Sequence, residues 1–395
     1  MKNTNMLLGL CSILIIGTLF SGCNTKQLVE NNSELIEEKA NNSSEYDETN
    51  CTTITLNDSN TDISGEGAEI SDSVLTITKE GSYILNGTFN GMVIVDTTKD
   101  SKVQLILDNV KISKDSSAPI YVKQADEVTL TLPDGSENTI TNTGDFVAID
   151  EEDINAAIYS NDDIEINGNG SLTISSEKGH GIKSSDDVII TNGNITINAA
   201  KDGVHGKEHV QIDNGNINID AAEGIEGTII TINDGGITID ASDDGINAAA
   251  KAEDLGTPTV EINGGNLTIN MASGDTDGID ANGDLYINGG TVIVNAQSPF
   301  DYDGVAEHNG GTIIVNGEKI EDITNQFGNM GPGGFENPGD FDPNNMPEDF
   351  NPGNRPERPD GFKGKGDKEP PADFDPNNLP ENFDKRQKPE TEQVF

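Results

Sequence analysis

The chain of 395 residues contains no tryptophan, only 5% aromatic residues, and 23 lysines and arginines against 70 aspartates and glutamates. Its formal net charge is −47. A protein that binds nucleic acid needs a basic surface to neutralise the phosphates, so this composition argues against a nucleic-acid partner. The same charge disfavours docking of the folded protein on an anionic membrane surface.

Arginine and cysteine are scarce where they would matter most. Residues 52–325 contain 48 acidic residues, 12 lysines and no arginine. Bidentate recognition of a sugar carboxylate by a guanidinium group is therefore not available in this region. Of the three cysteines, only Cys51 would remain as a thiol after the processing described next, so we predict no internal disulfide.

An apolar run over residues 6–20 follows Lys2 and is shorter than a membrane-spanning helix requires. Its length is typical of a signal peptide, which we predict over residues 1–22. The run ends in Ser-Gly-Cys, which resembles a bacterial lipobox, although Phe20 stands where most lipoboxes have leucine. We expect lipidation of Cys23 and anchoring on the extracellular face of a bacterial membrane, with simple secretion as the alternative.

Two segments of low complexity flank the middle of the chain. Residues 23–51 follow the lipidated cysteine with Asn, Glu and Ser and few apolar residues, which predicts a flexible tether. Residues 326–395 are rich in Pro, Gly, Asp and Phe. Frequent prolines prevent both helix and sheet, so we predict a disordered tail.

The segment between these flanks repeats. Each repeat has a Gly-Ile or Gly-Val pair, an Asn-Gly or Asp-Gly turn, and a strand-like segment in which apolar residues alternate. Spacings between the pairs are 22, 21, 21, 33 and 26 residues, and insertions at 248–258 and 297–302 would explain the two longer ones. The pairs begin at Gly181, Gly203, Gly224, Gly245, Gly278 and Gly304.

This periodicity predicts an all-β fold, a right-handed parallel β-helix over residues 52–325 with about 21 residues per coil. Each coil cannot bury its apolar side alone, so coils stack at roughly 4.8 Å and fill an interior with Ile, Val and Leu. The handedness follows from the general preference of parallel crossovers. A β-sandwich would also contain short strands but not repeats in matched register.

Stacking would place equivalent residues directly above one another, and the residues around each glycine are acidic. The position before the glycine reads His180, Asp202, Glu223, Asp244, Asp277 and Asp303, and the position two after it reads Lys183, His205, Glu226, Asn247, Asp280 and Ala306. Carboxylates at strand spacing repel by about 1 kcal/mol per pair even in water. Hard oxygen ligands in an exported protein suit Ca²⁺, and the alternative is a solvated acidic surface without metal. The predicted calcium ligands are Glu223, Glu226, Asp243, Asp244, Asn247, Asp277, Asp280, Asp301 and Asp303.

Three segments carry a family resemblance: Gly-Ser-Tyr-Ile-Leu-Asn-Gly-Thr at 81–88, Glu-Gly-Ile-Glu-Gly-Thr at 223–228, and Ala-Ser-Asp-Asp-Gly-Ile-Asn at 241–247. They resemble the repeats of a bacterial cell-surface family of carbohydrate-binding domain proteins, over residues 52–325. The resemblance implies a pectate-lyase-like β-helix with bound calcium that binds cellulose or acidic pectic polysaccharide. The chain has fewer intermediate coils than is typical of that family.

We expect polysaccharide binding without catalysis, with calcium bridging protein and sugar carboxylates. Aromatic rings that could stack on sugars, or equally cap the core, are those of Tyr121, Tyr159, Tyr286 and Tyr302, together with Phe300. A polysaccharide lyase is the main alternative, and its base would be a lysine near the acidic residues: Lys183, Lys201 or Lys207. We expect carboxylates beside these lysines to keep them protonated. A glycoside hydrolase with two carboxylates and a passive adhesin or surface spacer are the remaining alternatives.

Overall fold

The computed structural model describes residues 50–149, 153–250, 255–274 and 276–325. The predicted signal peptide, Cys23, nearly all of the tether and the whole predicted tail lie outside these residues. The chain divides into two units, Met1–Gly334 and Phe335–Phe395, and every described residue belongs to the first. Within the described part, no helix has the length and apolar character needed to cross a membrane.

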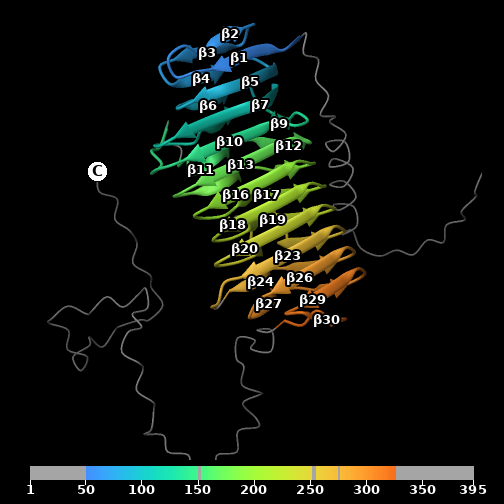
Figure 1. Ribbon diagram of the computed structural model, residues 1–395. Helices are drawn as coiled ribbons and strands as arrows, with labels where there is room; N and C mark the ends of the chain where they lie inside the picture. The colour runs from blue at the N-terminus through green and yellow to red at the C-terminus, as the bar shows by residue number, and fades with distance from the viewer. Residues whose placement is uncertain (1–49, 150–152, 251–254, 275, 326–395) are drawn as a thin grey trace, which may run out of the picture. The chain divides into compact units, whose positions relative to one another are not determined.

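The described residues form 30 β-strands and no α-helix, joined in one mostly parallel sheet (Figure 1). The strands follow one another along one axis from β1 to β30 (Figure 1). Each strand pairs with the equivalent strand of the next repeat, so the pairings form three parallel stacks. The all-β, mostly parallel part of the prediction is therefore confirmed, in a solenoid-like arrangement.

The first stack begins with the end of β5 (Gly81–Phe89) and the second half of β7 (Lys102–Lys114). It continues through β10 (Glu137–Asn142), β13 (Ser171–Ser176), β16 (Asn194–Ala199), β18 (Asn216–Ala221), β20 (Gly236–Ala241), β23 (Asn266–Met271), β26 (Thr291–Asn295) and β29 (Thr312–Val315).

The second stack carries the residues of the candidate site. It contains β4 (Val74–Ile77), β6 (Met92–Asp96), β8 (Ile120–Gln124), β11 (Ala156–Ser160), β14 (His180–Ser184), the first part of β17 (Val204–Ile212), the first part of β19 (Ile225–Ile232), β21 (Ile246–Ala248), β24 (Asp277–Ala281) and β27 (Ser298–Tyr302).

The third stack contains β1 (Thr52–Leu56), the first parts of β5 and β7, β9 (Glu127–Leu132), β12 (Asp163–Gly168), β15 (Val188–Ile190), the second parts of β17 and β19, β22 (Thr259–Ile262), β25 (Asp284–Ile287) and β28 (Ala306–His308). The only antiparallel pairs in the described sheet involve β2 (Asp62–Ser64), β3 (Ala68–Ser71) and β30 (Glu318–Ile320), at the two ends. These hairpins pair edges that would otherwise be open to other strands.

The core follows from the alternation in each strand. From β13 to β26, the two central inward positions of each first-stack strand are isoleucine, leucine or valine, and each is at most 2% exposed. Registered pairing aligns them, so apolar side chains contact their equivalents one repeat away. One such row is Ile195, Ile217, Ile237, Leu267, Val292 and Ile313.

The glycine that marks each repeat is required by close packing. A Cβ at Gly224 would collide with the carbonyl oxygen of Gly245 in the next repeat and with the side chain of Ile239. Equivalent collisions bring Gly181 against Gly203 and Gly245 against Gly278. The recurring glycine therefore marks the points where the backbones of neighbouring repeats come into close contact.

The sixth Gly-Ile or Gly-Val pair, which begins at Gly304, does not mark the repeat position predicted from the sequence. The register pairs Ile279 with Phe300, so the position equivalent to Gly278 is Pro299. Residues 298–302 form β27 rather than an insertion. The other predicted insertion, at 248–258, is confirmed between β21 and β22, and a few further extra residues lie between β23 and β24. A search for Gly-Ile or Gly-Val pairs misses a repeat in which proline replaces the glycine.

Candidate cation-binding site

Two rows of polar side chains run along the second stack. Backbone hydrogen bonds link equivalent residues of the first row; the N–H of Gly203, for example, donates to the carbonyl oxygen of Glu223. Strand register fixes the second row, in which His205 pairs with Glu226 and Glu226 with Asn247. The first row is His180, Asp202, Glu223, Asp244, Asp277 and Ser298. The second row is Lys183, His205, Glu226, Asn247, Asp280 and Asp301.

The rows come together because only a glycine and one buried residue separate them in each repeat. Asp202 and His205 illustrate this, with Oδ2 of the carboxylate 2.7 Å from Nδ1 of the imidazole. The same Asp202 oxygen lies 2.9 Å from Nδ1 of His180 in the preceding repeat. Contacts therefore run both along and between the rows.

Further along, the side chain of Asn247 links the second row to the first. Its Nδ2 donates to Oε2 of Glu223 over 3.0 Å, whereas its Oδ1 is buried and has no hydrogen-bond partner. A buried carbonyl oxygen without a donor is costly unless another positive group approaches it. The side-chain oxygen of Asn247 is thus held among carboxylates, and no group in the described structure donates a hydrogen bond to it.

The C-terminal part of the rows is mostly acidic. Asp244 accepts from the backbone N–H of Asp277 over 3.3 Å, and Ser298 Oγ donates to Oδ1 of Asp277. Asp280 pairs in register with Asp301. Among the described row members, Lys183 is the only lysine or arginine, so no lysine or arginine within the rows balances the charges at this end.

Burial and mutual repulsion shift the acids toward their protonated forms. Burial, with repulsion from Glu226, raises the pKa of Glu223 to about 7. Burial also raises the pKa of Asp244 to about 7 and that of Asp280 to about 6, and the charge of Asp301 adds to the second shift. Carboxylates in adjacent repeats therefore retain protons close to neutral pH when no cation balances them.

Asp202 behaves differently because histidines surround it. Its burial opposes ionisation, but hydrogen bonds with His180, His205 and Glu226 outweigh that and hold the pKa of Asp202 well below its usual range. The pKa of His205 is raised, since its contacts with Asp202 and Glu226 overcome its burial. Burial lowers the pKa of His180.

The structure brings most of the predicted ligands into the two rows and leaves two outside. Glu223, Glu226, Asp244, Asn247, Asp277, Asp280 and Asp301 are row members. Asp243 is exposed in the turn next to Asp244, and Asp303 is exposed beyond the end of β27. The prediction placed Asp303 in the first row because it treated Gly304 as the sixth repeat glycine. Ser298 occupies that first-row position. Asp301 occupies the second-row position that the prediction assigned to Ala306.

Asp202 belongs with the predicted ligands although it was not among them. Carboxylate oxygens of Asp202, Glu223 and Glu226 lie within 4.8 Å of one another, and so do donor atoms of His180, Asp202 and His205. The signal was available in the sequence, since all of these residues occupy the repeat positions that flank the glycine. A third group, on the third stack and its turns, is Asp163, Asp186 and Asp187.

The predicted aromatic surfaces differ in accessibility. Tyr121 has no exposed surface and Tyr159 is 6% exposed, with their ring centroids 5.9 Å apart. Ile154 packs against them in a small apolar cluster. Phe300 is in the main core. The burial of these rings is the outcome in which an aromatic residue caps the core, and it leaves them no free face for a sugar.

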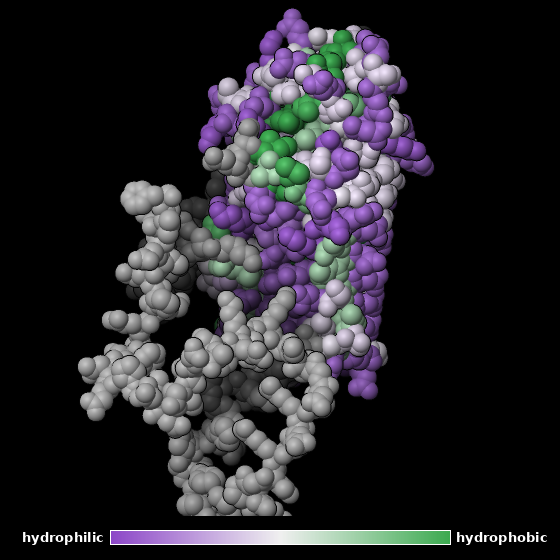
Figure 2. Space-filling model, turned by 90° about the vertical axis from the view of Figure 1, so that its left-hand side faces the viewer, coloured by the Kyte–Doolittle hydropathy of each residue, from purple (hydrophilic) through white to green (hydrophobic). Residues whose placement is uncertain are grey.

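Tyr286 and Tyr302 remain partly exposed. Tyr286 donates to Oδ2 of Asp284 over 3.2 Å, and burial together with that carboxylate raises its pKa. Tyr302 follows Asp301 in β27, next to the end of the second row. Figure 2 shows that hydrophilic residues cover most of one long face, whereas hydrophobic residues gather near its N-terminal end.

Lys183 is half-buried at the start of the second row. Burial lowers its pKa, against the opposing influence of Asp202 and Glu226. The expectation that neighbouring carboxylates would keep this lysine protonated therefore omitted the larger effect, which is desolvation. Lys201 and Lys207 are exposed.

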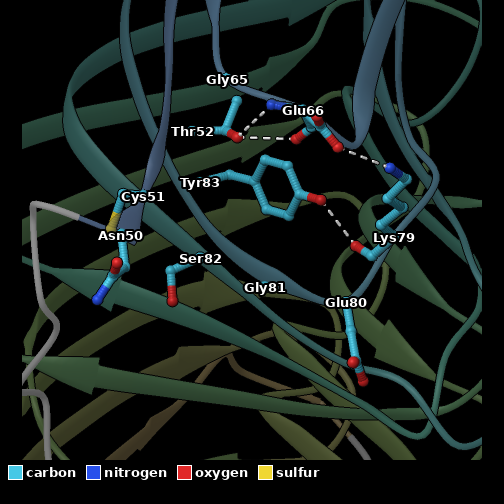
Figure 3. Close-up of a pocket in the computed structure, with 10 residues that line it drawn as sticks. All are labelled: Asn50, Cys51, Thr52, Gly65, Glu66, Lys79, Glu80, Gly81, Ser82 and Tyr83. Atoms are coloured by element: carbon cyan, nitrogen blue, oxygen red, sulfur yellow. Dashed lines mark hydrogen bonds and ion pairs between the residues drawn. The ribbon is translucent and has the colours of Figure 1, made fainter.

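A pocket of about 380 Å³ lies at the N-terminal end and is separate from the rows (Figure 3). Its wall includes Tyr83, whose hydroxyl donates to the carbonyl oxygen of Lys79 over 2.8 Å, and the ion pair between Lys79 and Glu66 at 3.0 Å. Strands β7, β9, β12 and β15 separate this end from β17 in the third stack. It contains none of the predicted ligands.

A family model described as carbohydrate-binding domain-containing protein matches residues 71–320. The chain belongs to this family. A carbohydrate-binding domain-containing protein of Acetivibrio thermocellus is 43% identical over 137 residues, which are 34% of this chain and 48% of the relative. The chain thus spans about half the length of that curated relative.

A solved structure is also similar to this family member. It is described as the polysaccharide lyase-like protein from C. thermocellum in a gadolinium derivative. The two chains are 33% identical with a TM-score of 0.51, and the match covers 67% of this chain and 96% of the other. The shared fold agrees with the all-β, mostly parallel sheet, and it extends over nearly the whole of the neighbour.

Proposed function

We propose that this family member binds polysaccharide at the cell surface through calcium held in the two acidic rows, and does not cleave it. The observation that carries the proposal is the alignment of carboxylates from successive repeats, with pKa values raised to about 7 at Glu223 and Asp244. Membership of a carbohydrate-binding family supports polysaccharide as the ligand. The lyase-like neighbour supports the same class of ligand.

We infer that the three stacks are the faces of a right-handed parallel β-helix. Register offsets of 22 residues from Asn194 to Asn216 and 20 from there to Gly236 support a coil of about 21 residues. The handedness rests on the general preference of parallel crossovers. Such a helix presents one residue per coil along each row, which suits an extended polymer.

The donor set fits calcium. The rows offer carboxylate oxygens and the unsatisfied Oδ1 of Asn247, and calcium accepts six to eight such oxygens with flexible geometry. Glu223, Glu226, Asp244, Asn247 and Asp280 would hold it, together with their neighbours in the rows. The neighbour is described as a gadolinium derivative, and a trivalent lanthanide ion, like calcium, prefers oxygen ligands.

An acidic polymer is the ligand that these charges favour once calcium is bound. The described fold contains no arginine, so a uronate carboxylate would be held by shared cations rather than by a guanidinium group. Bound calcium would supply positive charge between protein and sugar carboxylates. Tyr286, which is partly exposed, is the predicted ring best placed to contact a sugar, because Tyr302 packs against the main core.

Retention on insoluble polymer tests the proposal. We expect the protein to be retained on polygalacturonate in calcium and released by chelator, because polymer and protein are both acidic. Retention on cellulose should respond to chelator only as far as folding does. Loss of binding to both polymers in calcium would contradict the proposed function.

A polysaccharide lyase is the second candidate, and Lys183 is the observation that favours it. A lyase needs a base that can lose its proton, and burial lowers the pKa of this lysine beside the acidic rows. Incubation with polygalacturonate and calcium, followed at the ultraviolet absorbance of unsaturated uronates, separates the candidates. Steady product formation that disappears in Lys183→Met would replace the binding proposal with catalysis.

We also propose that Cys23 anchors the protein on the extracellular face of the membrane through a lipid. Replacing Cys23 with Ala should move nearly all of the protein from the membrane fraction to the medium, since no lipid could be attached. Fractionation followed by immunoblotting measures this. A Cys51→Ala variant is the control and should stay with the membrane; unchanged retention of the Cys23 variant would contradict the anchor.

A further inference from the structure

Four polar side chains form a buried cluster where the two rows begin. His180 and His205 are each 7% exposed, and Asp202 and Glu226 are each 5% exposed. The chain has four histidines in total, and two of them meet here. Their ring centroids are 5.5 Å apart, in an edge-on arrangement. The cluster therefore combines nitrogen and oxygen ligand atoms, whereas the rows beyond it offer oxygen ligands from Asp, Glu, Asn and Ser.

Three short contacts converge on two atoms. Nδ1 of His205 lies 2.7 Å from Oδ2 of Asp202 and 2.6 Å from Oε2 of Glu226. Oδ2 of Asp202 also lies 2.9 Å from Nδ1 of His180. One imidazole nitrogen carries at most one proton, so His205 cannot donate fully to both carboxylates.

His180 presents the same difficulty. Its Nδ1 accepts a hydrogen bond from the backbone N–H of Asp202 over 3.4 Å, which uses the nitrogen lone pair. A nitrogen that accepts from that N–H has no proton to give to the carboxylate oxygen 2.9 Å away. Nδ1 of His180, Oδ2 of Asp202 and Nδ1 of His205 therefore lie close together with fewer protons than their contacts require, and a cation bound among them would replace the 3.4 Å hydrogen bond to His180.

We propose that His180, Asp202, His205 and Glu226 bind one divalent transition ion of the zinc class. Two imidazoles and two carboxylates are donors that zinc takes in four-coordinate sites, with bonds of about 2.0–2.2 Å. Such bonds place the ligand atoms roughly 3.3 Å apart, so the present contacts need to open by only about half an ångström. His180 is in β14, His205 in β17 and Glu226 in β19, and Asp202 lies just before β17, so the ligands come from three successive repeats.

This site is separate from the calcium proposal in its chemistry. Imidazole favours zinc, nickel and copper over calcium, which takes oxygen ligands. Asp202 and Glu226 border both sets, whereas Asn247 and Asp280 continue the row with oxygen donors alone. Lys183 adds one positive charge beside two carboxylates, which leaves net negative charge for a divalent ion.

Zinc titration in the presence of excess calcium tests the proposal. Isothermal calorimetry of the mature chain should give one zinc ion per chain, because calcium saturates the oxygen-only positions and competes poorly for imidazole. His180→Gln and His205→Gln should each weaken zinc binding by at least about tenfold. Polygalacturonate retention in calcium should be unchanged in His180→Gln, so failure of this site can be told from failure of the proposed function.

Two controls and one spectrum complete the design. His308→Gln and Cys51→Ser remove side chains of types that can bind zinc but that lie outside the proposed site, so they should leave the zinc affinity unchanged. If the buried variants fail to fold, cobalt added to the unmodified protein should give the intense visible absorption of four-coordinate Co²⁺. The proposal would be overturned by an absence of zinc binding in calcium or by histidine variants that bind zinc as tightly as the unmodified protein. The weak spectrum of six-coordinate cobalt would also overturn it.

Discussion

Calcium is expected to raise the melting temperature of this protein by about 5–10 °C for each ion bound. The two acidic rows repel in its absence, and binding to the folded state alone contributes about 2.7 kcal/mol per site at a hundredfold excess over Kd. For a domain of this size, each kcal/mol corresponds to roughly 2–4 °C. Differential scanning calorimetry in calcium and in chelator measures the difference.

Neutral variants of the rows should raise the melting temperature in chelator and reduce the increase that calcium produces. Asp244→Asn and Glu223→Gln remove a carboxylate whose ionisation burial opposes, so the protein in chelator should become more stable. The same changes remove a calcium ligand, so the gain on adding calcium should shrink. Asp220→Asn, at an exposed position of β18 outside the rows, is the matched control and should alter neither. No calcium-dependent shift, or a loss of stability in chelator for Asp244→Asn, would contradict the calcium proposal.

The sequence predicted the all-β stacking because one physical requirement recurs in every repeat. Where two repeats touch, only glycine fits, and alternating isoleucines fill the interior, as Gly224 and Ile237 illustrate. The rows followed directly, since register aligns residues at the same offset from each glycine. Glu226, Asn247 and Asp280 are therefore neighbours in the structure, as they are in the repeat pattern.

The errors arose where a residue broke the pattern without breaking the register. Pro299 takes the place of the glycine in the last repeat, and hydrogen bonds to β24 hold β27 in place regardless. Burial by residues outside the repeat was equally invisible. Ile154, in the segment between β10 and β11, packs against Tyr121 and Tyr159, and nothing in repeat spacing reports such a contact.

The chemistry of the histidine cluster also needed three dimensions. Most members of each row could be predicted from the sequence, but only the structure shows that Asp202 contacts histidines on both sides. That difference lowers the pKa of one carboxylate and leaves others in the same row raised. Identical repeat positions therefore acquire different chemistry from their neighbours along the stack.

In chelator, the protein should be more stable at pH 5 than at pH 8. The pKa values of Glu223 and Asp244 are about 7 in the folded state and that of Asp280 is about 6, whereas unfolded acids titrate near 4. Between those values the folded state binds more protons than the unfolded state, so stability falls as pH rises and levels off above about 8. The lowered pKa of Asp202 acts only at more acidic pH, below the unfolded value.

Calcium should reverse this dependence, because the ion binds the ionised carboxylates and competes with the protons. Each pKa unit corresponds to about 1.4 kcal/mol, and partial exposure of these acids reduces their sum to a few kcal/mol, or about 5–10 °C across the range. Thermal melts at half-unit pH steps, with calcium and with chelator, measure both curves. Asp244→Asn should flatten the chelator curve, and Asp220→Asn should leave it unchanged. A melting temperature in chelator that rises from pH 5 to 8 would show that the rows hold no shared protons, and the electrostatic basis for a cation there would be lost.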